Sequence, residues 1–304
     1  MTLQHSRRTF LVQAASVVAL SLSRANTAWA AESNPIGLEL YTVGAALTQD
    51  PAGTLKQVKA IGYDEVEVSG FGKLTPKALR ALIDDSGLKC PAAHLQFGFE
   101  DTAKILQQAN DLRVPYAASS ILLPEAPTAG MAGVLDKLNK LTADDFKKIA
   151  ELANRIGEQS QKAGVQFAYH NHAHEFRDLG GDKTGYEILL AETDPALVQF
   201  ELDCGWMITA GANPVDYFRR FPKRYRVIHV KDFPASTKVT TVMGGPGMPH
   251  PTQLGEGHID YKPVIAAART AGVQHFFVEQ DPPMTVHTPL EAAAIDYKYL
   301  RNIF

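Results

Sequence analysis

The segment VQFAYHNH, residues 165–172, joins a strand-like apolar run to a polar end that carries two histidines. Three later strand-like runs end in the same manner, at Asp203, His229 and Glu279. In a parallel (β/α)8 barrel the carboxyl ends of the strands meet at one face, where catalytic and ligand-binding residues gather. Four successive strands that end in an imidazole or a carboxylate therefore indicate a barrel enzyme with a divalent metal ion.

Strand and helix patterns alternate from residue 31 to the end of the chain, as in a parallel sheet covered by helices. The predicted strands are residues 36–43, 65–69, 88–95, 116–122, 165–169, 198–202, 225–230 and 275–278. The clearest helical patterns are residues 54–61, 76–86, 103–109, 142–163 and 289–300. Residues 124–133 and 233–257 read as long loops, because they are rich in Gly, Pro and Thr. The sequence therefore predicts an α/β fold, a (β/α)8 TIM barrel in one domain.

The first thirty residues have the pattern of a twin-arginine export signal. SRRTFL at residues 6–11 precedes an apolar stretch at 12–22 and the small-residue motif AWA at 28–30. A membrane anchor needs about 20 apolar residues, and this stretch is shorter. We expect residues 1–30 to be a signal peptide and residues 31–304 to be the barrel domain, exported folded to the periplasm or secreted, without membrane insertion after signal removal.

The charge balance argues against a nucleic-acid partner. The chain has 30 Lys and Arg residues against 33 Asp and Glu residues, and residues 1–30 hold three of the basic ones and no acidic one. Residues 31–304 therefore carry a net charge of −6, from 27 basic and 33 acidic residues, whereas nucleic-acid phosphates favour a basic surface. The two cysteines, Cys90 and Cys204, fall at opposite ends of the predicted barrel, so we expect free thiols.

The metal hypothesis rests on His170, Asp203, His229 and Glu279. Mixed imidazole and carboxylate ligands suit Mn²⁺, Zn²⁺, Co²⁺ or Fe²⁺ better than Mg²⁺ or Ca²⁺, which prefer oxygen ligands. A lone His or Asp is more often a surface or supporting polar residue, but four of them at matching strand ends favour one divalent ion.

These motifs together resemble the xylose isomerase-like sugar phosphate isomerase/epimerase superfamily, which also contains endonuclease IV. The resemblance covers nearly all of residues 31–304 and is carried by residues 167–172, 175–176, 201–206, 229–232, 255–260 and 277–281. It implies a TIM barrel with one divalent metal ion, bound by Glu, Asp, His and Glu on strands five to eight. The last three ligands correspond to Asp203, His229 and Glu279.

The strand-five position departs from the family pattern, because His170 stands where most members have Glu. Either His170 is the ligand, which we favour, or Glu175 reaches back to the metal while His170 and His172 line the pocket. Epimerases of the superfamily use two metal-bound glutamates as bases on opposite faces of a carbon. Here Glu279 is the one glutamate among the expected ligands if His170 is the fourth. This favours isomerisation with one base, or elimination and hydration at a keto sugar.

The resemblance also implies chemistry through an enediolate, which a divalent cation stabilises. We expect Glu279 to be the base and His94 and Lys231 to act as an acid or to stabilise the oxyanion. Either residue has a structural alternative, since His94 can be a hydrogen-bonded histidine of the barrel and Lys231 can pair with a carboxylate. Candidate substrate-binding residues are His172, Trp206, Glu67 and Tyr41.

Three functions follow from this reading. The leading one is a metal-dependent isomerase or epimerase-like enzyme acting on an unphosphorylated sugar or keto sugar, with a lyase or hydratase on the same site as its runner-up. A non-catalytic periplasmic sugar-binding barrel is the second. A nuclease is the third and is disfavoured by the negative charge and by Trp206, which stands where endonuclease IV has a metal-binding His. Metal identity and oligomeric state stay open at this stage.

Overall fold

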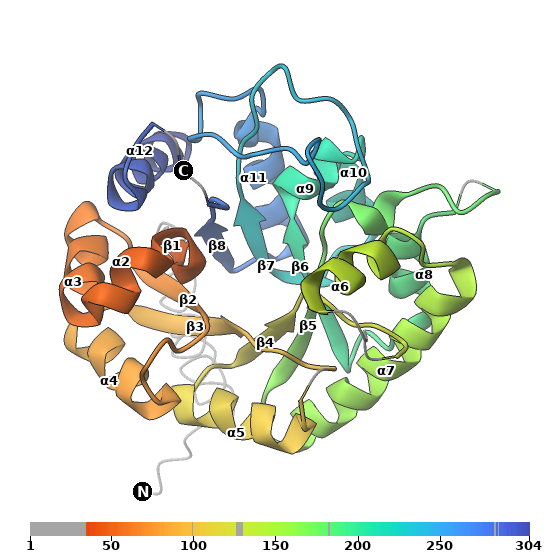
Figure 1. The fold of residues 1–304 in the computed structure, drawn as a ribbon, viewed down its shortest axis with the longest axis horizontal. Coiled ribbons are helices and arrows are strands. Elements are labelled where there is room, and N and C mark those ends of the chain that lie inside the picture. Colours follow the sequence, from red (N-terminus) through yellow and green to blue (C-terminus); the bar gives the residue numbers. More distant parts are fainter. Residues whose placement is uncertain (1–34, 99, 126–129, 182, 283, 285) are drawn as a thin grey trace, which may run out of the picture. The chain divides into compact units, whose positions relative to one another are not determined.

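A computed structural model describes residues 35–304, apart from residues 99, 126–129, 182, 283 and 285. Eight parallel strands follow one another in sequence order, and β1 pairs with β8 to close the barrel (Figure 1). This confirms the predicted TIM barrel. The strands are β1 Ile36–Glu39, β2 Glu65–Ser69, β3 Lys89–His94, β4 Tyr116–Ser119, β5 Gln166–His170, β6 Val198–Asp203, β7 Tyr225–Val230 and β8 His275–Val278.

A main helix follows each strand and surrounds the barrel (Figure 1). These helices are α3 Pro51–Ile61, α4 Pro76–Asp85, α5 Thr102–Leu112, α7 Ala143–Lys162, α8 Gly185–Glu192, α10 Pro214–Arg220, α11 Tyr261–Ala271 and α12 Pro289–Ile303. Short segments precede some of them: η1 Leu40–Val43, α2 Gly44–Gln49, α6 Gly130–Leu138, η2 His174–Phe176 and α9 Cys204–Thr209. The helices pack on the outer faces of the strands, so the large hydrophobic core lies between helices and barrel.

Several sequence-based boundaries are wrong, and the fourth strand, for example, ends at Ser119 and not at residue 122. The first strand ends at Glu39, because Leu40–Val43 forms a 3-10 turn in which Leu40 and Val43 are buried and Tyr41 is exposed. The predicted loop 124–133 ends early, because α6 begins at Gly130. The predicted loop 233–257 is confirmed, since it holds no helix or strand.

The side chain of Asp232 anchors that long loop after β7. Its carboxylate accepts backbone N–H groups from Gly255, His258 and Ile259, each at 3.1 Å. A Cβ at Gly257 would lie 2.1 Å from the same carboxylate, so only glycine fits there. The loop is therefore held beside the carboxyl end of the barrel.

Two further expectations concern the rest of the chain. Cys90 and Cys204 are buried free thiols, as predicted. In the described part of the chain, each helix is too short or too polar to cross a bilayer. The predicted export signal lies outside the described residues.

Candidate active site

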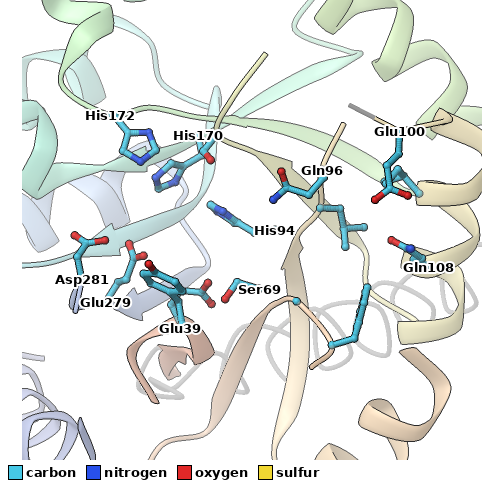
Figure 2. A pocket seen from close by; sticks show the side chains of 16 residues that line it. Glu39, Ser69, His94, Gln96, Glu100, Gln108, His170, His172, Glu279 and Asp281 are labelled. Carbon is cyan, nitrogen blue, oxygen red and sulfur yellow. The ribbon is translucent and has the colours of Figure 1, made fainter. Parts of the chain in front are cut away.

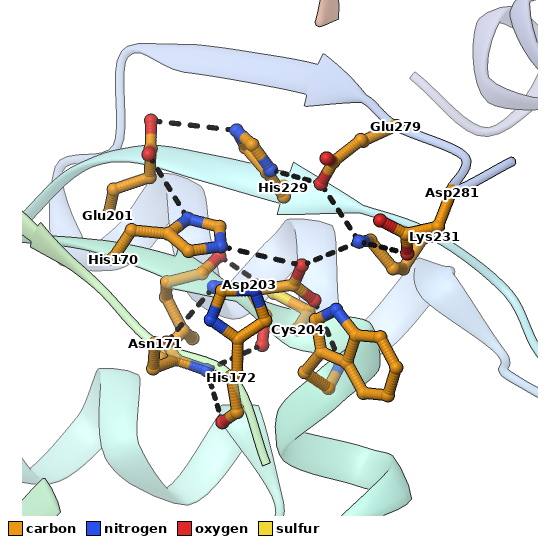
Figure 3. A network of polar contacts seen from close by, with 12 residues as sticks. His170, Asn171, His172, Glu201, Asp203, Cys204, His229, Lys231, Glu279 and Asp281 are labelled. Carbon is orange, nitrogen blue, oxygen red and sulfur yellow. Dashed lines mark hydrogen bonds and ion pairs between the residues drawn. The ribbon is translucent and has the colours of Figure 1, made fainter. Parts of the chain in front are cut away.

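The barrel brings together the four residues of the metal hypothesis at the carboxyl ends of β5 to β8 (Figure 3). His170 ends β5, Asp203 ends β6 and pairs in register with His229 on β7, and Glu279 follows β8. One donor atom from each residue lies within 4.8 Å of the others, and all four side chains are buried. The strand ends thus converge as the sequence pattern indicates.

These residues fit a divalent cation. Asp203 Oδ1 accepts the backbone N–H of Trp206 at 2.8 Å, while its buried Oδ2 has no hydrogen-bond partner. Burial lowers the pKa of His170 well below its usual value, so the ring is neutral and offers a lone pair. Two imidazoles and two carboxylates are a donor set for a transition metal rather than for Ca²⁺.

A second group of donors overlaps the first and contains a residue that sequence reasoning missed. His94, His170, Glu201 and His229 also offer atoms within 4.8 Å of one another. Glu201 lies two residues before Asp203 on the same strand, so both side chains point into the barrel. The alternation in ELD, residues 201–203, is a signal that could have revealed Glu201, but attention to strand ends alone passes over it.

Lys231 lies among three carboxylates beside the donors (Figure 3). Its Nζ is 3.2 Å from Asp203, 2.8 Å from Glu279 and 2.9 Å from Asp281. Burial by itself lowers the pKa of Lys231, but these carboxylates outweigh burial and hold that pKa well above its usual value. The lysine therefore stays protonated and offsets part of the negative charge.

A cavity of about 450 Å³ opens beside the donors and extends toward α5 (Figure 2). Its polar lining residues are Glu39, Tyr41, Ser69, His94, Gln96, Glu100, Gln108, Ser120, His170, His172, Glu279 and Asp281. Among the lining residues of the described chain there is no Lys or Arg. Buried atoms of Glu39, Ser69 and His172 lack hydrogen-bond partners, so the wall offers free polar groups to a hydroxylated ligand.

The predicted pocket residues divide into two groups. His94, His172 and Tyr41 line the cavity. Trp206 is buried instead, beside Phe233 and 5.3 Å from the Lys231 ammonium, and is not part of the cavity wall. A stacking role for its indole therefore has no support from its position.

Glu67 and Glu175 are also buried away from the cavity wall. Glu67 Oε2 lies 2.7 Å from His229 Nε2, beneath the donors. The Glu175 carboxylate accepts the Tyr169 hydroxyl and the His172 backbone N–H, both at 3.0 Å. Of the two strand-five alternatives, His170 joins the donor group and Glu175 does not.

Comparison with known proteins agrees with the fold. An inosose dehydratase of Lacticaseibacillus casei is 27% identical over 88% of this chain and 94% of its own length. A crystal structure of a sugar phosphate isomerase/epimerase from Parabacteroides distasonis superposes with a TM-score of 0.68 at 24% identity, over 90% of this chain and 95% of that one. A structure of the IOLI protein with bound zinc has a TM-score of 0.63 at 16% identity, over 88% and 97%. The model of the xylose isomerase-like TIM barrel family matches residues 55–303, and the chain belongs to that family.

Proposed function

We propose that this protein is a metal-dependent lyase that eliminates water from an uncharged keto sugar or keto polyol through an enediolate. The observation that carries this proposal is that one carboxylate of the donor group, Glu279, lines the cavity, while His170 and His172 occupy the strand-five side. Epimerisation by two opposed carboxylate bases needs a second carboxylate on that side. Elimination needs one base and one acid.

His170, Asp203, His229 and Glu279 would hold the divalent cation. When bound, such an ion polarises the substrate carbonyl and stabilises negative charge on the neighbouring oxygens. Burial raises the pKa of Glu279, but Lys231 and His229 outweigh burial and keep it well below its usual range. Glu279 is therefore ionised and accepts the proton α to the carbonyl, and the electrons of that C–H bond form the enediolate double bond.

His94 is the acid in this proposal. Burial lowers the pKa of its imidazole, but Glu201 and Glu67 outweigh burial and raise it to about 9. The protonated ring lines the cavity and donates its proton to the β-hydroxyl, which leaves as water when the C–O bond breaks. The enediolate electrons re-form the carbonyl and make the new double bond between the α and β carbons. Lys231 holds its proton too tightly to serve and instead orders the Glu279 and Asp281 carboxylates.

The cavity wall supports an uncharged substrate. Glu39, Glu100, Glu279 and Asp281 line it without a Lys or Arg among the described lining residues, and such a wall repels a phosphate group. The similarity to inosose dehydratases supports elimination from a cyclic keto polyol. The proposed export to the periplasm accords with an unphosphorylated substrate.

One-base isomerisation is the second candidate, because Glu279 could return the same proton to the adjacent carbon. To separate the two, Mn²⁺-loaded protein is incubated in D₂O with an inosose or with fructose. We expect loss of one water from the inosose, seen by mass spectrometry, and a fall of roughly 10²-fold or more in Glu279→Gln. Deuterium uptake without water loss would favour isomerisation. Sugar binding without any exchange would favour a non-catalytic barrel.

A further inference from the structure

The two imidazoles of the metal site each contact other groups through both ring nitrogens. His170 Nδ1 lies 3.1 Å from Glu201 Oε2, and its Nε2 faces Asp203 Oδ2 at 3.9 Å (Figure 3). His229 Nδ1 lies 2.7 Å from Glu279 Oε2, and its Nε2 lies 2.7 Å from Glu67 Oε2. Both rings therefore stand between a site carboxylate on one side and a deeper carboxylate on the other.

This arrangement creates two competing donor sets. The upper set is His170 Nε2, Asp203, His229 Nδ1 and Glu279, and the lower set is His94, His170 Nδ1, Glu201 and His229 Nε2. A neutral imidazole has one N–H and one lone pair. Each ring can therefore serve one set only, and the tautomers of His170 and His229 decide which set binds an ion.

We propose that Glu201 and Glu67 are positioning residues that assign the metal to the upper set. Glu201 accepts the Nδ1–H of His170 and Glu67 accepts the Nε2–H of His229, which leaves His170 Nε2 and His229 Nδ1 as ligands. Metal-binding histidines commonly donate their other N–H to a carboxylate in this way. The inference rests on the metal site of the proposed function but not on its reaction.

The lower set is already engaged in hydrogen bonds. Glu201 Oε2 contacts both His94 Nε2 and His170 Nδ1. In the upper set, the buried Asp203 Oδ2 accepts no hydrogen bond and lies 3.2 Å from the Lys231 ammonium. A buried oxygen without a hydrogen bond occurs in both sets, at Asp203 Oδ2 in the upper one and at Glu201 Oε1 in the lower one, so the histidine tautomers decide between them.

The barrel contains a matched control for these contacts. Glu65 lies two residues before Glu67 on β2, and its Oε2 is 2.7 Å from His275 Nδ1 on β8. The contact has the same residue types and the same length as that between Glu67 and His229. His275 belongs to neither donor set, so Glu65 variants test the loss of such a contact away from the site.

The first experiment measures Zn²⁺ affinity of the otherwise intact protein by competition with a chromophoric chelator, without substrate. Glu201→Ala and Glu67→Ala should each raise the Kd by roughly 10- to 100-fold, as loss of an outer-sphere partner does in other metal sites. The Gln variants should be affected less, because Gln retains an acceptor oxygen. Glu65→Ala should leave the Kd unchanged. Equal Kd values in all three Ala variants would overturn the proposal.

A second experiment decides between the donor sets. His94→Ala removes a lower ligand and should change the Zn²⁺ Kd by less than roughly tenfold, whereas Asp203→Asn should weaken binding more than any outer-sphere change. A larger loss of Zn²⁺ affinity in His94→Ala than in Asp203→Asn would place the ion in the lower set and overturn the proposal. Nitrogen-15 spectra of the Zn²⁺-loaded protein should show His170 protonated at Nδ1 and His229 at Nε2. Opposite tautomers would contradict it even where a variant fails to fold.

Discussion

The two ends of the barrel interior differ sharply although the same strands build them. Ala92, Val227 and Phe277 form a small apolar cluster inside the barrel. Two residues further along β3, β7 and β8, on the same faces, stand His94, His229 and Glu279. One repeat of the strand pleat thus separates an apolar plug from a layer of buried charge. Each of these strands therefore contributes a packing residue at one level of the barrel and a chemically active residue at the next.

The apolar end is fitted closely. A Cβ at Gly37 would lie 2.3 Å from the Phe277 ring, so the glycine makes room for the aromatic side chain. The charged end has the opposite character, since burying ionised groups is costly unless they are paired. Its pairs, such as Lys231 with Glu279 at 2.8 Å, offset that cost without removing it. The apolar end should therefore supply stability, and the charged end should supply function.

Phe277→Ala should have the largest effect on stability. Deleting a buried aromatic ring typically costs about 3–5 kcal/mol, because the cavity collapses only in part. Urea unfolding monitored by circular dichroism measures this change. The refolded variant should still bind one Zn²⁺ with the affinity of the parent protein. Loss of Zn²⁺ binding with little loss of stability would contradict the assignment of stability to the apolar end and of metal binding to the charged end.

Asp203→Asn should have the next largest effect, on metal affinity. The variant keeps Oδ1, which accepts the Trp206 N–H at 2.8 Å, but loses the anionic oxygen that faces the other donors. We expect the Zn²⁺ Kd to rise about 100-fold or more, or about 2.7 kcal/mol. Chelator competition and metal analysis by mass spectrometry give the value. Asp281→Asn is the matched control, because Asp281 contacts Lys231 but lies outside both donor groups.

Glu39→Gln should change how stability depends on pH. Burial, followed by repulsion from Glu67, raises the pKa of Glu39 to about 8 from 4.5. The folded protein therefore holds a proton that the unfolded chain releases, so stability falls as pH rises between those two values. Gln cannot ionise and should reduce that slope, making the variant relatively more stable near pH 8. Urea unfolding of the metal-free protein across this range tests the sign, and an unchanged slope would contradict it.

The sequence predicts the barrel and the four strand-end donors well, because both depend on local patterns. A strand followed by a polar tip is visible in 165–172 without any tertiary information. The contact of Glu67 with His229 is not visible in this way, because β2 and β7 are not neighbours and meet only across the closed barrel. The burial of Trp206 against Phe233 is not visible in the local sequence either, because it depends on how the long loop folds back.

The boundary error at Leu40–Val43 has a physical cause as well. An apolar run of this length is buried equally well as the end of a strand or as a 3-10 turn. The turn places Tyr41 at the cavity wall, which periodicity alone does not reveal. Local pattern therefore finds the elements, and the closure of the barrel decides which side chains meet.

Glu65→Gln should have the smallest effect, and it sharpens the comparison most finely. Glu65 and Glu67 belong to one strand, and each lies 2.7 Å from a histidine nitrogen. If the type of contact alone decided the effect, Glu65→Gln and Glu67→Gln would change metal affinity equally. Because His275 is partly exposed and lies outside the donor groups, replacing the charged Glu65 acceptor by an amide should cost at most about 1 kcal/mol, the net value of an ordinary hydrogen bond, with unchanged metal affinity. A weaker metal site in Glu65→Gln would mean that the two ends of the barrel are coupled, and that the apolar cluster between them transmits the change.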